Sequence, residues 1–296
     1  MTRTTPAPPV DVTKKFPELV EYARTTVRLH PRPGTPAVRD SHIGGPLLWP
    51  AGEAWPTCDA PILDVAGNLN QWRPDSPIPL VGVAQFFKRD IPEIPFPEDK
   101  DLLQLLWCPN EHQQHDISGP AIQLIWRRTA DLIDVATGPI GLDMPAIAEK
   151  DYLPRPCVLH PERVTEYPYS EELPEDIEAA VDEWDEETEG HYQSLLSIAP
   201  GCKIGGWESW HLTDMYELPC PVCGTETEPL LKLASSEWDG GSGPRWQPCE
   251  ERHLVSGEPE YRDAHEPTAL NLGRWGDLTI FVCPMSSEHG FRMTIQ

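Results

Sequence analysis

The chain carries two stretches of similar sequence in the same order, and this repetition constrains its fold more than any other feature. An Ile-Gly-Gly turn occurs at residues 43–45 and again at 204–206. In each half it is followed by Trp residues, a cysteine, an apolar run and a strand-like segment that ends in Cys-Pro, at 102–109 and 278–284. Short apolar runs bounded by turn residues are typical of buried strands. The order predicts a duplicated unit, with two similar halves that share a core.

The remaining sequence favours an α+β fold that is rich in strands. We expect residues 1–10 to be disordered, because they are rich in Thr and Pro, and residues 11–296 to form one internally repeated domain. The first repeat covers about 41–130 and the second about 197–296. Apolar residues at helical spacing predict an N-terminal helix over 11–29.

Residues 171–190 contain eleven acidic residues and no basic residue. Four apolar residues recur there at helical spacing: Leu173, Ile177, Val181 and Trp184. This pattern predicts an acidic helix that docks by a narrow apolar stripe and bridges the two halves. A run of charge is most often a solvated face, and the alternative is a surface for a partner.

The formal net charge is −25, from 48 acidic and 23 basic residues. Phosphate backbones repel such a surface, so nucleic-acid binding is not expected. No apolar run approaches the roughly 18 to 20 residues of a membrane span, and the N-terminal residues lack the apolar core of a signal peptide. We therefore expect a cytoplasmic protein, whose acidic surface keeps it in solution or steers a basic partner protein toward it.

The sharpest local signal is a pair of cysteines separated by two residues, Cys220 and Cys223, with a glycine after them. Thiolates at this spacing bind one tetrahedral ion when the chain turns tightly between them, as in a zinc knuckle. A redox pair would need a helix after the cysteines, and no helical pattern follows. We predict a structural zinc ion with two further ligands, Cys283 and His289; reduced cysteines without metal are the alternative.

A second pair could complete the knuckle instead. Cys249 and His253 offer a thiol and an imidazole at a spacing of four residues. We favour Cys283 and His289, because a Cys-Pro turn after a strand resembles the second knuckle of a zinc ribbon. With four protein ligands such a site would be closed, and therefore structural rather than catalytic.

The first half contains a similar but less complete set of candidate metal ligands. Its candidate ligands are Cys108, His112, His115 and Cys58. A second metal ion is one interpretation. The other is that Cys58, which has no cysteine close to it in sequence, is simply a small buried apolar residue.

No catalytic motif stands out in the sequence. The glycine pairs at 44–45 and 205–206 lack the spacing of a phosphate-binding loop, so we expect tight turns or close backbone packing there. His211 and Glu237 lie in polar clusters that could line a cleft, which leaves a metal-dependent or cleft-based hydrolase as the alternative function. Turn and capping roles are the simpler interpretation of both clusters.

Short motifs recur in a fixed order along both halves: Ile43-Gly44-Gly45, Val83-Ala84-Gln85-Phe86, Asp101-Leu102-Leu103-Gln104, Lys203-Ile204-Gly205-Gly206, Leu230-Leu231-Lys232-Leu233 and Gly276-Asp277. In this order they resemble the YwqG-like family, a bacterial family of domains of unknown function. The chain departs from the family at Lys232, where a second Leu-Gln pair is often found. The resemblance implies an α+β fold with internal duplication and brings no catalytic residues.

Members of this family are similar to proteins encoded near secreted toxins, which suggests immunity or protein binding, although fold does not fix function. We therefore expect a non-enzymatic cytoplasmic protein of the toxin-immunity type. It would carry a structural zinc ion and bind another protein.

Overall fold

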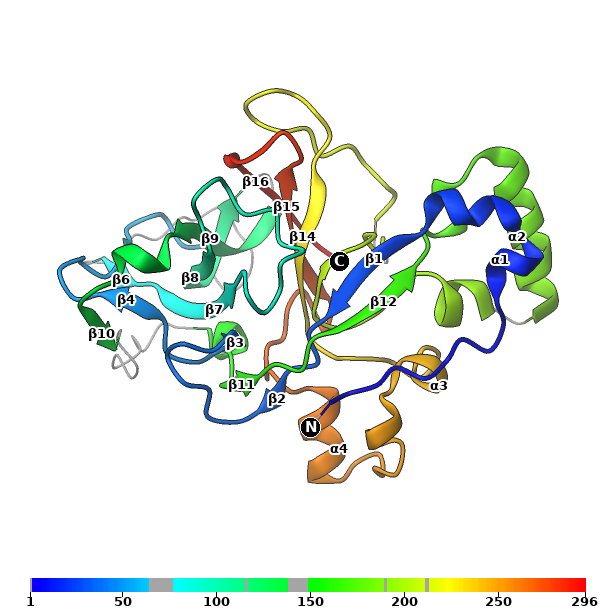
Figure 1. Cartoon of the computed structure of the whole chain (residues 1–296), viewed down its shortest axis with the longest axis horizontal. Helices are drawn as coiled ribbons and strands as arrows, with labels where there is room; N and C mark the ends of the chain where they lie inside the picture. Colours follow the sequence, from blue (N-terminus) through cyan, green and yellow to red (C-terminus); the bar gives the residue numbers. More distant parts are fainter. Residues whose placement is uncertain (1, 64–76, 115–116, 138–148, 189–190, 211–212) are drawn as a thin grey trace.

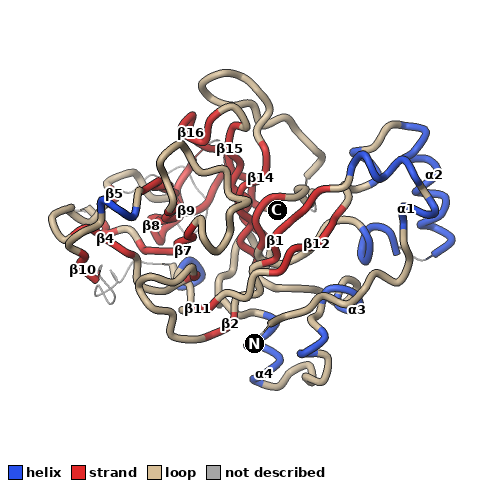
Figure 2. The backbone as a smooth tube through the Cα atoms, viewed as in Figure 1, coloured by secondary structure: helices blue, strands red, loops and turns tan. Residues whose placement is uncertain are grey.

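The computed structural model describes residues 2–63, 77–114, 117–137, 149–188, 191–210 and 213–296. Two six-stranded antiparallel sheets dominate the fold, and they lie side by side in Figure 1 with a helical region beyond one of them. Figure 2 shows that strands and loops make up most of the backbone, while α1 and α2 gather at one end. The expected strand-rich α+β class is confirmed.

One sheet, the C-terminal sheet, has the strand order β12-β1-β13-β14-β15-β16. Its strands are β1 (Arg24–Arg28), β12 (Glu162–Glu166), β13 (Lys203–Gly205), β14 (Glu228–Ala234), β15 (Asp277–Cys283) and β16 (Ser286–Ile295). The N-terminal sheet has the order β2-β11-β3-β7-β8-β9. Its strands are β2 (Arg32–Pro33), β3 (His42–Ile43), β7 (Val81–Phe87), β8 (Leu102–Gln114), β9 (Ile117–Arg127) and β11 (Cys157–Val158). Two short pairs join β4 (Leu48–Pro50) to β10 (Val135–Thr137) and β5 (Thr57–Cys58) to β6 (Ile78–Pro79).

The longest helix in the described part of the chain is α2 (Glu175–Thr188). The other α-helices are α1 (Val12–Lys15), α3 (Gly243–Trp246) and α4 (Pro259–His265). Short 3-10 segments are η1 (Pro17–Tyr22), η2 (Thr129–Asp131), η3 (Lys150–Tyr152), η4 (Ser170–Glu172) and η6 (Cys249–Glu251), and η5 (Tyr192–Leu196) is a π-helical turn. Among the described residues, no helix combines the length and the apolar character that crossing a membrane requires.

The chain passes directly from one sheet to the other twice. β1 in the C-terminal sheet is followed by β2 in the N-terminal sheet, and β11 in the N-terminal sheet is followed by β12 in the C-terminal sheet. β1 and β11 are inner strands, next to β13 and β3, whereas β12 and β2 lie at the sheet edges. The two sheets are therefore joined through continuous backbone at both crossings (Figure 1).

The strands that end the two predicted repeats are buried on both faces. Three side chains of β8 face a core to which both sheets contribute: Leu103, Leu105 and Trp107. Leu106 and Cys108 pack on the other side, in a cluster with Leu47. Successive side chains of a strand point to opposite faces, so a strand covered on both sides has a continuous apolar sequence. The strands expected at 102–107 and 278–282 are confirmed.

A row of buried polar side chains crosses the N-terminal sheet. His42 is paired with Gln85, and Gln85 with Gln104, and all three side chains are fully buried. Oε1 of Gln85 accepts the Leu48 N–H (2.9 Å), and Nε2 of Gln104 donates to the Leu48 carbonyl (3.0 Å). Because an unpaired buried backbone group is costly, these two amides explain why polar residues interrupt the apolar strands.

The first glycine pair forms the tight turn that the sequence predicts. Gly44 has a φ of +71°, and a Cβ on Gly45 would lie 2.9 Å from the ring of His42. The His42 ring is fixed on both sides, because Nδ1 accepts the Gly45 N–H (3.2 Å) and Nε2 donates to the Pro46 carbonyl (3.0 Å). Burial disfavours the charged imidazolium and lowers the pKa of His42 to about 4.

The N-terminal helix expected over 11–29 is wrong in its second part. The chain forms α1 and η1 and then the strand β1, whose residues pair with β12 on one side and β13 on the other. β-branched residues at 25–27 favour a strand. Phe16 and Leu19 do pack together as the helical spacing predicts, but Val27 belongs to the core between the sheets.

Residues 2–10, which we expected to be disordered, lie extended and form hydrogen bonds with distant parts of the chain. Arg3 Nε donates to Glu251 Oε1 (2.5 Å), and the Thr5 N–H donates to Glu162 Oε1 (2.9 Å). Composition predicted disorder because the segment is rich in Thr and Pro, whereas its order comes from distant acids, buried Glu251 and partly buried Glu162, that accept its hydrogen bonds.

The acidic helix exists as α2, but it does not bridge the two halves. It connects β12 to β13, and both strands belong to the C-terminal sheet. Its apolar stripe packs on Phe16 and Leu19 of the N-terminal segment, at the end of the molecule away from the N-terminal sheet (Figure 1).

His42 should make the fold sensitive to acid. The unfolded chain binds a proton at this histidine near pH 6.5, whereas the folded chain does so only near pH 4. The free energy of unfolding therefore falls as the pH drops from about 6.5 to 4, by about 3 kcal/mol for this group at the lower end. Urea unfolding at pH 7.0 and 4.5 should show a smaller acid-induced loss for His42→Gln than for the wild type. The exposed control His253→Gln should behave as the wild type, and an equal acid loss in all three proteins would contradict this linkage.

Candidate metal centre

The structure brings the four predicted ligands together. The donor atoms of Cys220, Cys223, Cys283 and His289 all lie within 4.8 Å of one another. They come from three places: the turn between β13 and β14, the end of β15, and β16. These residues form the knuckle cluster.

The knuckle cluster has the size of a single tetrahedral site. Cys223 Sγ lies 3.5 Å from Cys283 Sγ, and Cys220 Sγ lies 3.7 Å from His289 Nδ1. Metal–sulfur bonds of about 2.3 Å and metal–nitrogen bonds of about 2.0 Å, arranged tetrahedrally, separate two sulfurs by about 3.8 Å and a sulfur from a nitrogen by about 3.5 Å. The donor set and its dimensions therefore fit one ion that takes sulfur and nitrogen ligands.

Backbone hydrogen bonds fold the first two ligands toward each other. The Gly224 N–H donates to the Cys220 carbonyl (3.0 Å), and Gly224 has a φ of +74°. That conformation is easily adopted only without a Cβ, which is why glycine follows the second cysteine. The Val222 N–H points at Cys220 Sγ (3.4 Å), and such a donor favours the thiolate form.

The other two ligands are placed by the hairpin of β15 and β16. Cys283 pairs with Ser286 across a register shift at the end of β15, so the strand turns immediately after the cysteine. His289 then lies on the returning strand, facing the turn. Arg292 on the same strand donates from Nε to the Pro219 carbonyl (2.9 Å) and ties the hairpin to the turn that holds Cys220.

Electrostatics prepare the exposed ligand. The side chain and backbone of Thr225 form hydrogen bonds with Cys223 and lower the pKa of this thiol to about 6. Contact with Cys223 and Cys220 raises the pKa of His289. A divalent ion binds such a thiolate directly and displaces the proton that the neighbouring sulfurs favour on the imidazole.

The alternative ligands lie elsewhere. Cys249 is in η6, exposed, with its N–H donating to the Thr4 carbonyl (2.8 Å), and His253 is exposed just after η6. Neither residue belongs to the knuckle cluster. The sequence preference for Cys283 and His289 agrees with the geometry.

The two polar clusters that suggested a hydrolase line different cavities, one through Trp210 and the other through Asp239. His211 lies outside the residues that the structure describes. Glu237 is only 1% exposed, so substrate in solution does not reach its carboxylate. Ser235 takes the expected turn role: its Oγ donates to the Gly276 carbonyl (2.7 Å) and accepts the Leu272 N–H (2.9 Å).

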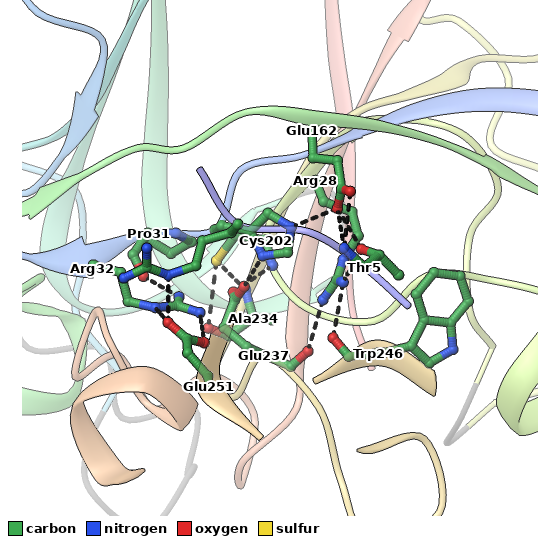
Figure 3. A network of polar contacts seen from close by, with 12 residues as sticks. Thr5, Arg28, Pro31, Arg32, Glu162, Cys202, Ala234, Glu237, Trp246 and Glu251 are labelled. Atoms are coloured by element: carbon green, nitrogen blue, oxygen red, sulfur yellow. Dashed lines mark hydrogen bonds and ion pairs between the residues drawn. The ribbon is translucent and has the colours of Figure 1, made fainter. Parts of the chain in front are cut away.

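Glu237 belongs instead to a buried charge network that the sequence did not reveal (Figure 3). His30 Nε2 lies 3.1 Å from Glu162 Oε2, and His30 Nδ1 lies 3.9 Å from Glu237 Oε2. Arg32 Nε donates to Glu251 Oε1 (2.6 Å). Burial, as the largest cause, lowers the pKa of His30 to about 3, so this histidine is neutral at pH 7. The signal in the sequence is a charged residue, Arg28, inside the strand β1. Its acidic partners lie so far along the chain that residue spacing could not identify them.

No protein-family model matches the chain, and no curated protein matches it. The function of the chain is therefore inferred from its own residues and their geometry.

Loss of two knuckle ligands should release one ion per chain. The double variant Cys220→Ser, Cys223→Ser removes both thiolates of the turn, so only two donors remain, the ion is lost and the hairpin loses the cross-link. We expect elemental analysis of protein purified without added metal to show one ion fewer than the wild type, together with a lower thermal unfolding temperature. Cys249→Ser, at an exposed cysteine outside this cluster, is the control and should change neither value. A wild-type protein that is free of metal and equally stable in chelator would rule out the site.

Proposed function

We propose that this chain is a non-enzymatic cytoplasmic protein that binds a basic partner protein through α2, and that a structural zinc ion stabilises its C-terminal sheet. The observation that carries the binding role is the acidic face of α2. Glu183, Glu186 and Glu187 are exposed, and none of the ion pairs among the described residues includes them.

The way α2 is docked supports this role. Its apolar stripe is covered, with Val181 fully buried and Trp184 packed edge-on against Phe16 at a ring-centroid distance of 5.7 Å. Asp185 accepts the Tyr192 N–H (2.5 Å) and holds the end of the helix. The helix is thus anchored by one face, and its acids are presented on a firm support. A fixed array of like charge steers an oppositely charged protein during encounter.

Zinc is the ion that best suits the knuckle cluster. Three thiolates and one imidazole in tetrahedral arrangement are a donor set typical of structural zinc. Four protein ligands leave no position for substrate, which supports a structural rather than a catalytic ion. The ion would cross-link the β13–β14 turn to the β15–β16 hairpin.

All eight cysteines are free thiols, which supports a reducing compartment such as the cytoplasm. Several of them are buried in the two sheets and are not paired with one another.

We also propose that the two sheets derive from one duplicated unit. β3-β7-β8-β9 and β13-β14-β15-β16 follow the same order, each with antiparallel neighbours. The second strand of each set has an irregularity at the corresponding place, at 82–84 and 229–231. The two segments that cross between the sheets also share the sequence Leu-His-Pro, at 29–31 and at 159–161. Matching registers at this many positions support a common origin.

Membership of the YwqG-like family remains our proposal for this chain. Two of its motif residues, Gln85 and Gln104, hold the buried backbone of Leu48. Lys232, where the chain departs from the family, lies at the corresponding place in the C-terminal sheet and pairs with Asp277 (3.5 Å). A toxin with a basic surface is the partner class that the resemblance suggests.

The binding role is tested by removing charge from α2. The triple variant Glu183→Gln, Glu186→Gln, Glu187→Gln keeps the shape of the side chains, so the fold should be unchanged. We expect capture of a basic protein from the lysate of the native cell by the wild type and much less by the variant. With the purified partner, the association rate should fall roughly fivefold at low salt and lose most of its salt dependence, because rim charges act mainly on association.

A matched control removes the same charge elsewhere. Glu217, Glu258 and Glu260 are exposed acids outside α2, and their triple change to Gln gives the same net charge. Equal effects of both triple variants would show that only net charge matters, and unchanged association in the α2 variant would assign this helix to solvated structure.

A further inference from the structure

A second group of metal-binding side chains converges in the N-terminal half. The donor atoms of Cys58, Cys108 and His112 lie within 4.8 Å of one another. Cys58 Sγ is 3.9 Å from His112 Nε2, close to the edge of a tetrahedron around one ion. Cys108 and His112 are buried and Cys58 is partly exposed, so the cluster lies just beneath the surface.

An irregularity in β8 brings two of these ligands together. Cys108 and His112 are four residues apart, which in an unbroken strand would separate them by about 13 Å. The pairing of β8 with β9 shifts between Cys108 and Glu111, opposite the adjacent residues Ala121 and Pro120. The extra residues include Pro109, which cannot donate to a strand ladder. The strand therefore bends at this point, and both donors face the same spot.

Hydrogen bonds set both donors for a metal. His112 Nδ1 lies 2.9 Å from the Pro61 carbonyl, which can only accept, so the proton sits on Nδ1 and the lone pair of Nε2 faces Cys58. A metal-binding histidine commonly has its other ring nitrogen held in this way. Asn110 Nδ2 donates to Cys108 Sγ (3.6 Å) and thereby orients this sulfur.

We infer that Cys58, Cys108 and His112 bind a second zinc ion, whose fourth coordination position is taken by water or a small anion. The described residues offer three donors in this cluster, against four in the knuckle cluster, and the further candidate His115 lies outside the residues that the structure describes. Three protein ligands with one exchangeable position are the arrangement in which zinc accepts a ligand from solution. This site is independent of the knuckle cluster and shares no residue with it.

The position of the open site follows from burial. Cys108 and His112 approach from the sheet, whereas Cys58 ends the short strand β5 and is the partly exposed ligand. A small anion or thiolate would reach the ion past Cys58. A zinc ion with two thiolates and a neutral imidazole carries no net charge, so it accepts one anion without a large electrostatic penalty.

The first test counts ions in ligand variants purified without added metal. We expect two zinc ions per chain in the wild type and in the control Cys249→Ser, and one in Cys58→Ser and in the double variant Cys220→Ser, Cys223→Ser. Cys58→Asp, which restores a donor, should recover part of the second ion. Two ions retained in Cys58→Ser, or one ion in the wild type that only the double variant Cys220→Ser, Cys223→Ser removes, would overturn the second site.

The second test probes the open position with azide after exchange of zinc for Co²⁺. Azide should change the visible cobalt spectrum of the wild type, and the change should be absent from Cys58→Ser, which keeps only the closed site. Cys58→Ser removes a partly exposed ligand, and circular dichroism should report the same fold as the wild type. If azide does not change the visible cobalt spectrum of the wild type, the proposal of an exchangeable coordination position is overturned.

Discussion

A buried positive charge at Arg28 organises the region where the chain leaves one sheet for the other. The side chain is fully buried, and burial lowers its pKa to about 10, so it stays charged at pH 7. Its Nη1 donates to Thr5 Oγ1 (2.8 Å) and to the Trp246 carbonyl (2.9 Å), and Glu162 and Glu237 lie close enough to stabilise the charge (Figure 3). A charge buried without such partners would cost several kcal/mol. The N-terminal segment, β12 and the region of α3 are therefore held around one guanidinium.

The sequence predicted correctly those features that depend on residues close together in the chain. β8 and β15 were predictable because burial on both faces removes the polar alternation that other strands show. The knuckle was predictable because Cys220 and Cys223 have the spacing of a metal turn. Cys283 could be added because it ends a strand, where the chain must reverse. For the same reason the tight turn at Gly44 followed directly from the glycine pair.

The sequence was insufficient where the deciding partner lies far along the chain. Residues 24–28 have an ambiguous apolar pattern, and pairing with β12 and β13, which lie more than a hundred residues later, makes them a strand. Order in residues 2–10 depends on Glu162 and Glu251, which composition cannot reveal. The convergence of Cys108 and His112 depends on an irregularity in strand register, and one sequence carries no direct signal for that.

The two crossings have a consequence for how the protein is made on the ribosome. β1 is an inner strand of the C-terminal sheet, yet β13 is synthesised about 175 residues after it. At roughly 5 to 20 residues per second, β1 waits roughly 10 to 40 s for that neighbour. During this interval its backbone N–H and C=O groups are an open edge to which other chains can add. The nascent chain thus depends on protection, by a chaperone or by temporary pairing, until its last third has emerged.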